Sequence, residues 1–80
     1  MKVKLKLIRV GMNMSEATIV DWYKQPGERF VDGDPLYAIE TEKVTQDVEA
    51  NGSGTMLEIV VASGTDAQVG DVVCIVDADV

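Results

Sequence analysis

The chain has 80 residues, which suit one small domain with an economical core, because a chain of this length buries only about 60% of its unfolded surface. Its 7 basic and 14 acidic side chains give a formal net charge of −7, which argues against nucleic acid and anionic membranes as partners. Histidine, the commonest general base and metal ligand, is absent from the sequence, so we expect neither a catalytic site nor a metal site.

Cysteine use and hydropathy indicate where such a chain would work. No apolar run approaches the roughly 18 residues of a membrane span, and no apolar signal segment follows Met1. Cys74 is the only cysteine and lies in an apolar run at 72–76, so we predict a reduced core thiol of an intracellular protein. The expected location is cytoplasmic, or the mitochondrial matrix if the sequence is a mature eukaryotic fragment.

Apolar residues recur with the spacing of β-strands along the chain. Val3, Leu5 and Leu7 alternate with lysines at positions 2, 4 and 6, which indicates a first strand with one solvated face. Further apolar segments at 18–23, 36–41, 44–50, 56–62 and 72–76 are separated by turns rich in glycine and proline. In the segment 44–50, the apolar residues at positions 44, 48 and 50 are expected to share one face. No segment has a helical period, so the predicted fold is all-β.

The two halves of the chain resemble each other at a shift of 37 residues. The shift aligns Thr18 with Thr55, Gly27 with Gly64, Gly33 with Gly70 and Asp34 with Asp71. Identities concentrated at turns indicate a duplicated half-domain, with two like half-sheets packed about a pseudo-two-fold axis. The same shift carries position 43 back to position 6 and forward to position 80. We therefore expect residue 43 at one end of the domain and both termini at the other.

Position 43 holds the most distinctive residue of the sequence. Lys43 is the only basic residue after Arg29, whereas residues 30–80 carry eleven acidic side chains. A single amine in an acidic stretch is easily distinguished by a modifying enzyme, so we interpret Lys43 as the attachment site of a carrier. The alternative is an ordinary ion-pair partner within a solvated acidic face.

A set of glycines, core positions and one acidic segment together point to a known family. The set comprises Gly11, Ile19, Trp22, Gly27, Gly33, Asp34, Leu36, Ile39, residues 40–44 (Glu-Thr-Glu-Lys-Val), Gly54, Gly64 and Gly70. Over essentially all of residues 1–80, the chain resembles a single lipoyl domain of the biotinyl/lipoyl attachment family. Such domains belong to the dihydrolipoamide acyltransferase components of 2-oxo-acid or acetoin dehydrogenase complexes. The resemblance implies a flattened β-barrel or sandwich of two four-stranded antiparallel sheets, with a modified lysine at a hairpin tip.

The resemblance also implies a function and partners. A lipoate ligase or lipoyl transferase would attach lipoate covalently to Lys43. The domain would then carry acyl groups and reducing equivalents between a thiamine-diphosphate-dependent dehydrogenase, an acyltransferase core and dihydrolipoamide dehydrogenase. It would be a carrier without an active site of its own. Recognition by the ligase and partners is expected from the hairpin and from the loop 9–15, at Glu40, Thr41, Glu42, Val44, Met12, Asn13 and Met14.

Several alternatives remain open at this point. A biotin carrier resembles this fold but holds its lysine between two methionines, whereas Lys43 lies between Glu42 and Val44. The family usually has aspartate where this chain has Glu42, which keeps the charge. The chain could also be an unmodified interaction module that uses its acidic face, or a free-standing enzyme, although no nucleophile motif is present. Met12 and Met14 could cap the edge of the sandwich, and Trp22 is expected in the core rather than as a stacking platform.

Overall fold

The computed structural model describes residues 1–9 and 14–79, and this part of the chain forms eight strands and no helix. The strands are β1 (Lys2–Lys6), β2 (Glu16–Trp22), β3 (Arg29–Phe30), β4 (Pro35–Glu40), β5 (Thr45–Glu49), β6 (Gly54–Ile59), β7 (Thr65–Gln68) and β8 (Val72–Ala78). The all-β prediction is confirmed. Within the described ranges, no helix is long and apolar enough to cross a membrane.

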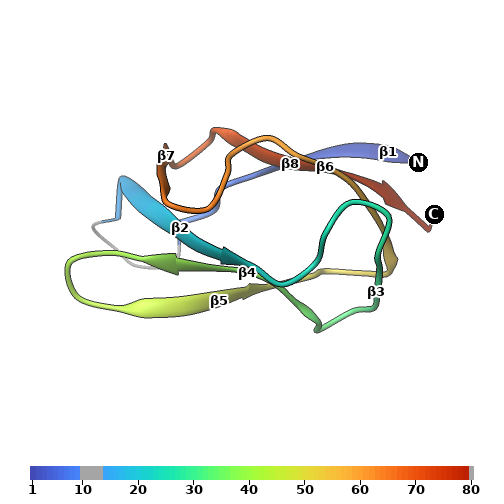
Figure 1. Ribbon diagram of the computed structural model, residues 1–80, viewed down its shortest axis with the longest axis horizontal. Helices are drawn as coiled ribbons and strands as arrows, with labels where there is room; N and C mark the ends of the chain where they lie inside the picture. The colour runs from blue at the N-terminus through green and yellow to red at the C-terminus, as the bar shows by residue number, and fades with distance from the viewer. Residues whose placement is uncertain (10–13, 80) are drawn as a thin grey trace.

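The strands form two antiparallel sheets of four strands that pack face to face (Figure 1). Sheet A has the order β1-β8-β6-β3, and sheet B has the order β5-β4-β2-β7. All strand pairs are antiparallel. The two sheets remain separate at their edges, so the fold is a sandwich and not a closed barrel.

Two short strands were not predicted, and the boundaries of the predicted strands differ from the observed ones by up to three residues. β3 and β7 have only two and four residues and bury one side chain each, so neither shows a readable period. Their pairing with β6 and β2 makes them strands. The strand expected over residues 44–50 begins one residue later, because β5 begins at Thr45 and Val44 lies in the turn before it with 49% of its surface exposed.

Hydrogen bonds at equivalent turns confirm the internal repeat. The N–H groups of Gly33 and Gly70 donate to Ala50 O and Leu7 O, both at 3.0 Å. Both glycines have positive φ, 90° and 98°, which explains why glycine occurs at these two turns. The carboxylates of the adjacent Asp34 and Asp71 accept backbone N–H groups at 3.0 and 2.9 Å, from residues 31 and 68. The two halves therefore share their turn chemistry as well as their strands.

The repeat is less uniform than one shift of 37 residues. That shift relates β2 to β6, β3 to β7 and β4 to β8, but β1 corresponds to β5 at a shift of 43. The connection between β1 and β2 has nine residues and the one between β5 and β6 has four, so Lys43 does not correspond to Lys6. Its counterpart is the gap between the termini, where Ala78 N–H donates to Met1 O at 2.7 Å. The β4–β5 hairpin accordingly lies at one end of the molecule, the hairpin end, and both termini lie at the other, the terminal end (Figure 1).

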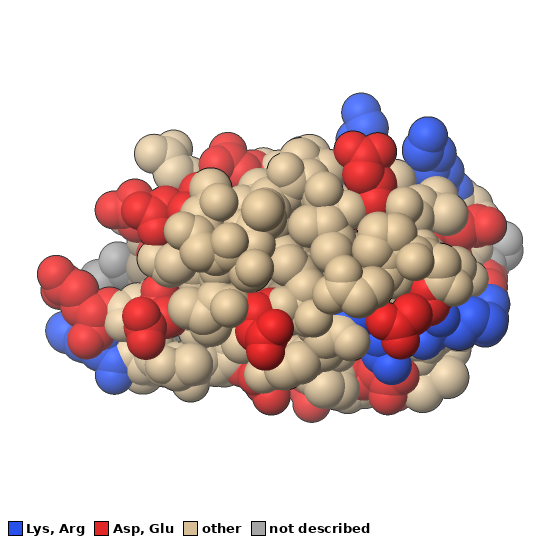
Figure 2. Space-filling view, viewed as in Figure 1, with Lys and Arg blue, Asp and Glu red and all other residues tan. Residues whose placement is uncertain are grey.

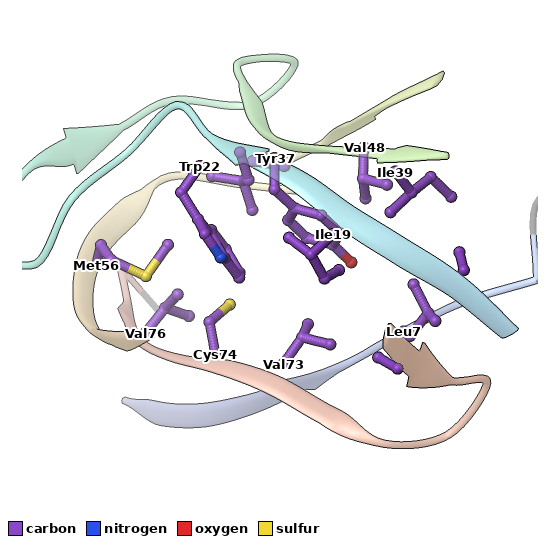
Figure 3. Close-up of a cluster of buried hydrophobic side chains, with 14 of the residues drawn as sticks. Leu7, Ile19, Trp22, Tyr37, Ile39, Val48, Met56, Val73, Cys74 and Val76 are labelled. Carbon is purple, nitrogen blue, oxygen red and sulfur yellow. The ribbon is translucent and has the colours of Figure 1, made fainter. Parts of the chain in front are cut away.

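The core lies between the sheets and is almost entirely apolar (Figure 3). Ile19, Ile39, Met56, Val73 and Cys74 are fully buried. Cys74 and Trp22 both lie in the core as predicted, because Cys74 is a free buried thiol and Trp22 is 6% exposed. Burial raises the pKa of Cys74 to about 12, so the thiol stays protonated and unreactive at neutral pH.

Gly54 provides a test of this packing. A Cβ atom at Gly54 would lie 2.5 Å from the carbonyl oxygen of Asp77 and 3.0 Å from Cζ of Phe30. We expect Gly54→Ala to lower the free energy of unfolding by about 1–3 kcal/mol, because the backbone of β8 must move to accept the methyl group. Urea titration measures the effect, with Ser53→Ala as the neighbouring control. A midpoint equal to that of the control would contradict the packing described for β6 and β8.

Candidate modification site

The hairpin that carries Lys43 extends from the end of sheet B. The last paired residues of β4 and β5 are Glu40 and Thr45, and the four residues between them form the turn (Figure 1). Lys43 is exposed, and both of its neighbours, Glu42 and Val44, are exposed as well. The amine is therefore carried at the tip of a projecting turn rather than in a cleft.

Thr41 closes this turn. Its N–H donates to Val44 O at 2.8 Å, and its Oγ1 accepts the N–H groups of Lys43 and Val44 at 3.4 and 3.2 Å. Among the described residues, positive φ occurs only at glycines, so the turn needs no left-handed residue. Threonine hydroxyls close turns in this way by bonding to backbone N–H groups two or three residues on. Sequence reasoning missed this role of Thr41, although a threonine two residues before an exposed lysine is the signal for it.

No ion pair holds the Lys43 amine within the described part of the chain. The salt bridges there are Met1–Asp77, Lys24–Asp34 and Arg29–Asp79. Viewed from one side, the hairpin end is mostly acidic, and the basic atoms there are separated from those near the termini (Figure 2). The structure gives no support to Lys43 as an ordinary ion-pair partner.

The predicted recognition residues divide into three groups. Glu40, Glu42 and Val44 are exposed and Thr41 is half-buried, all around the lysine. Met12 and Asn13 lie outside the described residues. Met14 is only 9% exposed and packs within the core cluster, which favours the packing alternative for this side chain over a role in docking.

The strand register brings the end of the loop 9–15 to the hairpin end. Thr18 pairs with Glu40, so the residues before Thr18 extend in the direction of the turn. Ser15 O accepts the N–H of Val69 at 2.9 Å, which fixes this end of the loop to the connection between β7 and β8. The described end of the loop and the lysine turn therefore share one end of the domain.

An apolar cleft lies at the terminal end instead. Val3, Phe30, Leu36, Ala50 and Val76 are among the residues that line it. The connection between β5 and β6 spans only residues 50–53. Its longer counterpart between β1 and β2 places Met14 in the core. The cleft is remote from Lys43 and belongs to a different part of the fold.

The Thr41 hydrogen bonds predict a measurable contribution to stability. We expect Thr41→Val to lower the free energy of unfolding by about 0.5–1.5 kcal/mol, because the side chain then accepts no N–H from the turn. The melting temperature should fall by about 4–8 °C for each kcal/mol lost in a domain of this size. Thr41→Ser keeps the hydroxyl and should melt close to wild type. Equal melting of the valine and serine variants would show that the hydroxyl does not stabilise the turn.

Comparison with known proteins places this geometry in a family. Residues 3–76 match the Biotin_lipoyl family, which is described as biotin-requiring enzyme. The chain is 36% identical over 70 residues to a dihydrolipoyllysine-residue succinyltransferase component of 2-oxoglutarate dehydrogenase complex from Bacillus subtilis. It is 39% identical over 71 residues to the component of the same name from Rickettsia bellii. These matches cover 88% and 89% of this chain but only 17% and 18% of the relatives, so the chain spans less than a fifth of their length.

Solved structures agree with the sequence matches. The lipoyl domain of the 2-oxoglutarate dehydrogenase complex from Azotobacter vinelandii superimposes with a TM-score of 0.75 at 27% identity. That match covers 92% of this chain and 94% of the other chain. A single-chain, multi-domain long-chain acyl-CoA carboxylase superimposes with a TM-score of 0.82 over 99% of this chain and 7% of that one. At 16% identity the second match shows the fold alone.

These matches also bear on the choice between lipoyl and biotinyl domains. The relatives at 36% and 39% identity are named for their dihydrolipoyllysine residue, and the superimposed domain of similar length is a lipoyl domain. The likeness to the carboxylase extends only to the fold. With the family match over residues 3–76 and the exposed lysine on the β4–β5 turn, the chain belongs to the biotinyl/lipoyl attachment family, as a domain of the lipoyl type.

Proposed function

We propose that this domain is a swinging-arm carrier that holds lipoate in amide linkage to Lys43. The observation that carries the proposal is the position of Lys43, exposed at the tip of the β4–β5 turn as the only basic side chain of residues 30–80. The amine has no ion-pair partner among the described residues, so its modification costs no contact within the domain.

The residues at the turn suit such an attachment. Amide formation replaces one N–H bond of the amine by a bond to the carboxyl carbon of lipoate, which loses one C–O bond so that water is released overall. The positive charge of the lysine is removed. When bound, lipoate supplies a dithiolane that accepts an acyl group together with two electrons. The hydroxyl of Thr41 accepts the backbone N–H of Lys43 and so closes the turn. The side chain of Lys43 takes no part in this hydrogen bond. The domain therefore presents the arm and leaves the chemistry to its partners.

The names of the relatives support a set of partners. They are components of dehydrogenase complexes, among them a 2-oxoglutarate, a branched-chain and an acetoin-cleaving system. We propose that a lipoate ligase loads Lys43, and that a thiamine-diphosphate-dependent dehydrogenase, an acyltransferase core and dihydrolipoamide dehydrogenase then use the arm. Tethering the arm near all three active sites raises its effective concentration at each of them. Identities of 29–39% to relatives that serve different acids leave the acyl group itself open.

The intact mass of the domain tests the proposal. The chain is produced in a host that makes both lipoate and biotin, and the modified residue is located by peptide mapping. One lipoyl adduct on Lys43 is the expected result. A biotin adduct would instead establish the biotinyl alternative, and an unmodified chain after incubation with a lipoate ligase would establish the interaction module.

A further inference from the structure

The two sheets follow the same plan but carry opposite charge. The strands of sheet B contain six acidic side chains and no basic one. The strands of sheet A contain four basic and two acidic side chains. Because a pseudo-two-fold axis relates the sheets, equivalent strands of the two sheets have the same packing and pairing requirements. The difference in charge therefore requires another explanation than folding.

The acidic side chains of sheet B lie on its outer face. Each of them adjoins a buried residue of the same strand, so the strand alternation turns it toward solvent. The set comprises Glu16, Asp21, Glu40, Asp47, Glu49 and Asp66. Neighbouring strands bring them close together, because Thr18 pairs with both Glu40 and Asp66, and Ala38 pairs with both Asp21 and Asp47. Like charges in such proximity repel, so this arrangement does not serve stability.

An aromatic side chain is held in the middle of this outer face. Tyr23 is 41% exposed, and its hydroxyl donates to Asp47 Oδ1 at 2.9 Å. Strand β4 lies between β2 and β5, so the Tyr23 side chain crosses β4 to reach Asp47. Ala38, at that point of β4, is only 3% exposed. The hydrogen bond from Tyr23 to Asp47 raises the pKa of Tyr23, which keeps the phenol protonated and oriented.

Two exposed apolar side chains belong to the same region. Val20 is 38% exposed, at an irregularity of β2 where the register with β4 shifts. Val44 is 49% exposed in the lysine turn. An exposed tyrosine and exposed apolar side chains on a charged surface are the composition that binding hot spots favour. The face also adjoins the turn directly, since Glu40 and Thr45 form the last strand pair before it.

We propose that the outer face of sheet B is the docking surface for the enzyme that acylates the arm, and that this enzyme meets it with a basic surface. The inference rests on the proposed function of Lys43. Charge complementarity speeds the encounter and fixes its orientation. Sheet A, with its lysines, repels the same basic surface, so the domain docks through sheet B with the lysine turn at the edge of the contact. Figure 2 shows acidic atoms gathered at the hairpin end of the molecule.

The test compares two doubly charge-reversed domains of equal net charge. Asp21→Lys with Glu49→Lys changes the outer face of sheet B away from the turn. Asp32→Lys with Glu58→Lys is the matched control, with one change before β4 and one on β6 of sheet A. Both pairs change the formal net charge from −7 to −3. None of the four side chains makes a hydrogen bond or ion pair to another described residue, so both variants should fold, which melting curves verify.

The measurement is the rate of reductive acylation of fully lipoylated domains by the thiamine-diphosphate-dependent dehydrogenase of the same organism. Pyruvate, 2-oxoglutarate, branched-chain 2-oxo acids and acetoin are tested in turn as acyl donors, at low salt and at roughly 0.3 M salt. We expect the sheet B variant to raise the KM for the domain about tenfold at low salt with kcat unchanged. The control should stay within about twofold of wild type. High salt should reduce the difference between the variants.

The outcomes separate this inference from the proposed function. Equal KM values for the two variants, with the wild-type domain acylated, would overturn the docking face and leave the carrier function intact. A wild-type domain that no donor acylates would overturn the proposed function, and the docking face with it. Sedimentation of the wild-type domain as a dimer that the sheet B variant dissociates would identify a second copy as the occupant and also overturn the proposal.

Discussion

Lys43→Arg is expected to abolish lipoylation completely while leaving the fold unchanged. Arginine keeps the positive charge, but its guanidinium is not deprotonated in proteins and cannot form the amide. The Lys43 side chain makes no ion pair to a described residue, and the turn uses only its backbone N–H. The free energy of unfolding should therefore change by less than about 0.5 kcal/mol. Intact mass after incubation with a lipoate ligase, together with a melting curve, checks both parts of this prediction.

The other lysines provide an internal control for this experiment. Lys2, Lys4 and Lys6 are exposed on β1, so exposure alone would allow a ligase to modify them. An adduct on the Lys43→Arg domain would show that the ligase reads exposed amines and not the turn. Moving the lysine to position 42 or 44 adds a geometric test, because a shift of one residue redirects the side chain. Efficient lipoylation of the shifted lysines would contradict a site defined by the geometry of the turn.

The strands with clean alternation could be predicted from the sequence, and the irregular ones could not. β1 was evident because its lysines and apolar residues alternate without interruption. In β2 and β6 the register shifts near Val20 and Leu57, which are equivalent positions of the repeat. Each extra residue is exposed and out of phase with the strand. An alternation pattern cannot reveal such a residue, because its exposure depends on pairing with strands that are distant in sequence.

The modification site was predictable in position but not in structure. The isolation of Lys43 is visible in the sequence, and the family resemblance assigns it a hairpin tip. The turn itself depends on one hydroxyl of Thr41 that bonds two N–H groups, a contact with no strong signature in composition. For Met14 the sequence suggested a role in recognition that its position in the structure does not favour. It was grouped with the recognition residues because the family places its loop beside the lysine tip, whereas it packs in the core cluster.

The same core holds the side chain whose loss should affect stability most. Trp22 is 6% exposed, its ring centroid lies 4.7 Å from that of Tyr37, and its Nε1 donates to Val61 O at 2.8 Å. The equivalent position of the second half is Ile59, which is only half-buried, so no symmetric partner replaces Trp22. The indole joins the end of β2 both to β4 and to the connection between β6 and β7.

Trp22→Ala should therefore lower the free energy of unfolding by about 3–5 kcal/mol. Domains of this size have total stabilities of about 4–12 kcal/mol, so a substantial fraction of this variant should be unfolded near 37 °C. Trp22→Phe retains most of the apolar volume but leaves Val61 O without its donor, and should lose about 1–3 kcal/mol. Urea unfolding followed by far-ultraviolet circular dichroism measures both variants without relying on tryptophan fluorescence. The lysine turn begins after Glu40, the last residue of β4, and Trp22 pairs with Tyr37 three residues earlier, so the fraction that stays folded should be lipoylated at the wild-type rate. If the alanine variant loses less than about 1 kcal/mol of unfolding free energy, neighbouring side chains fill the cavity left by the indole. Trp22 would then not be a major contributor to stability.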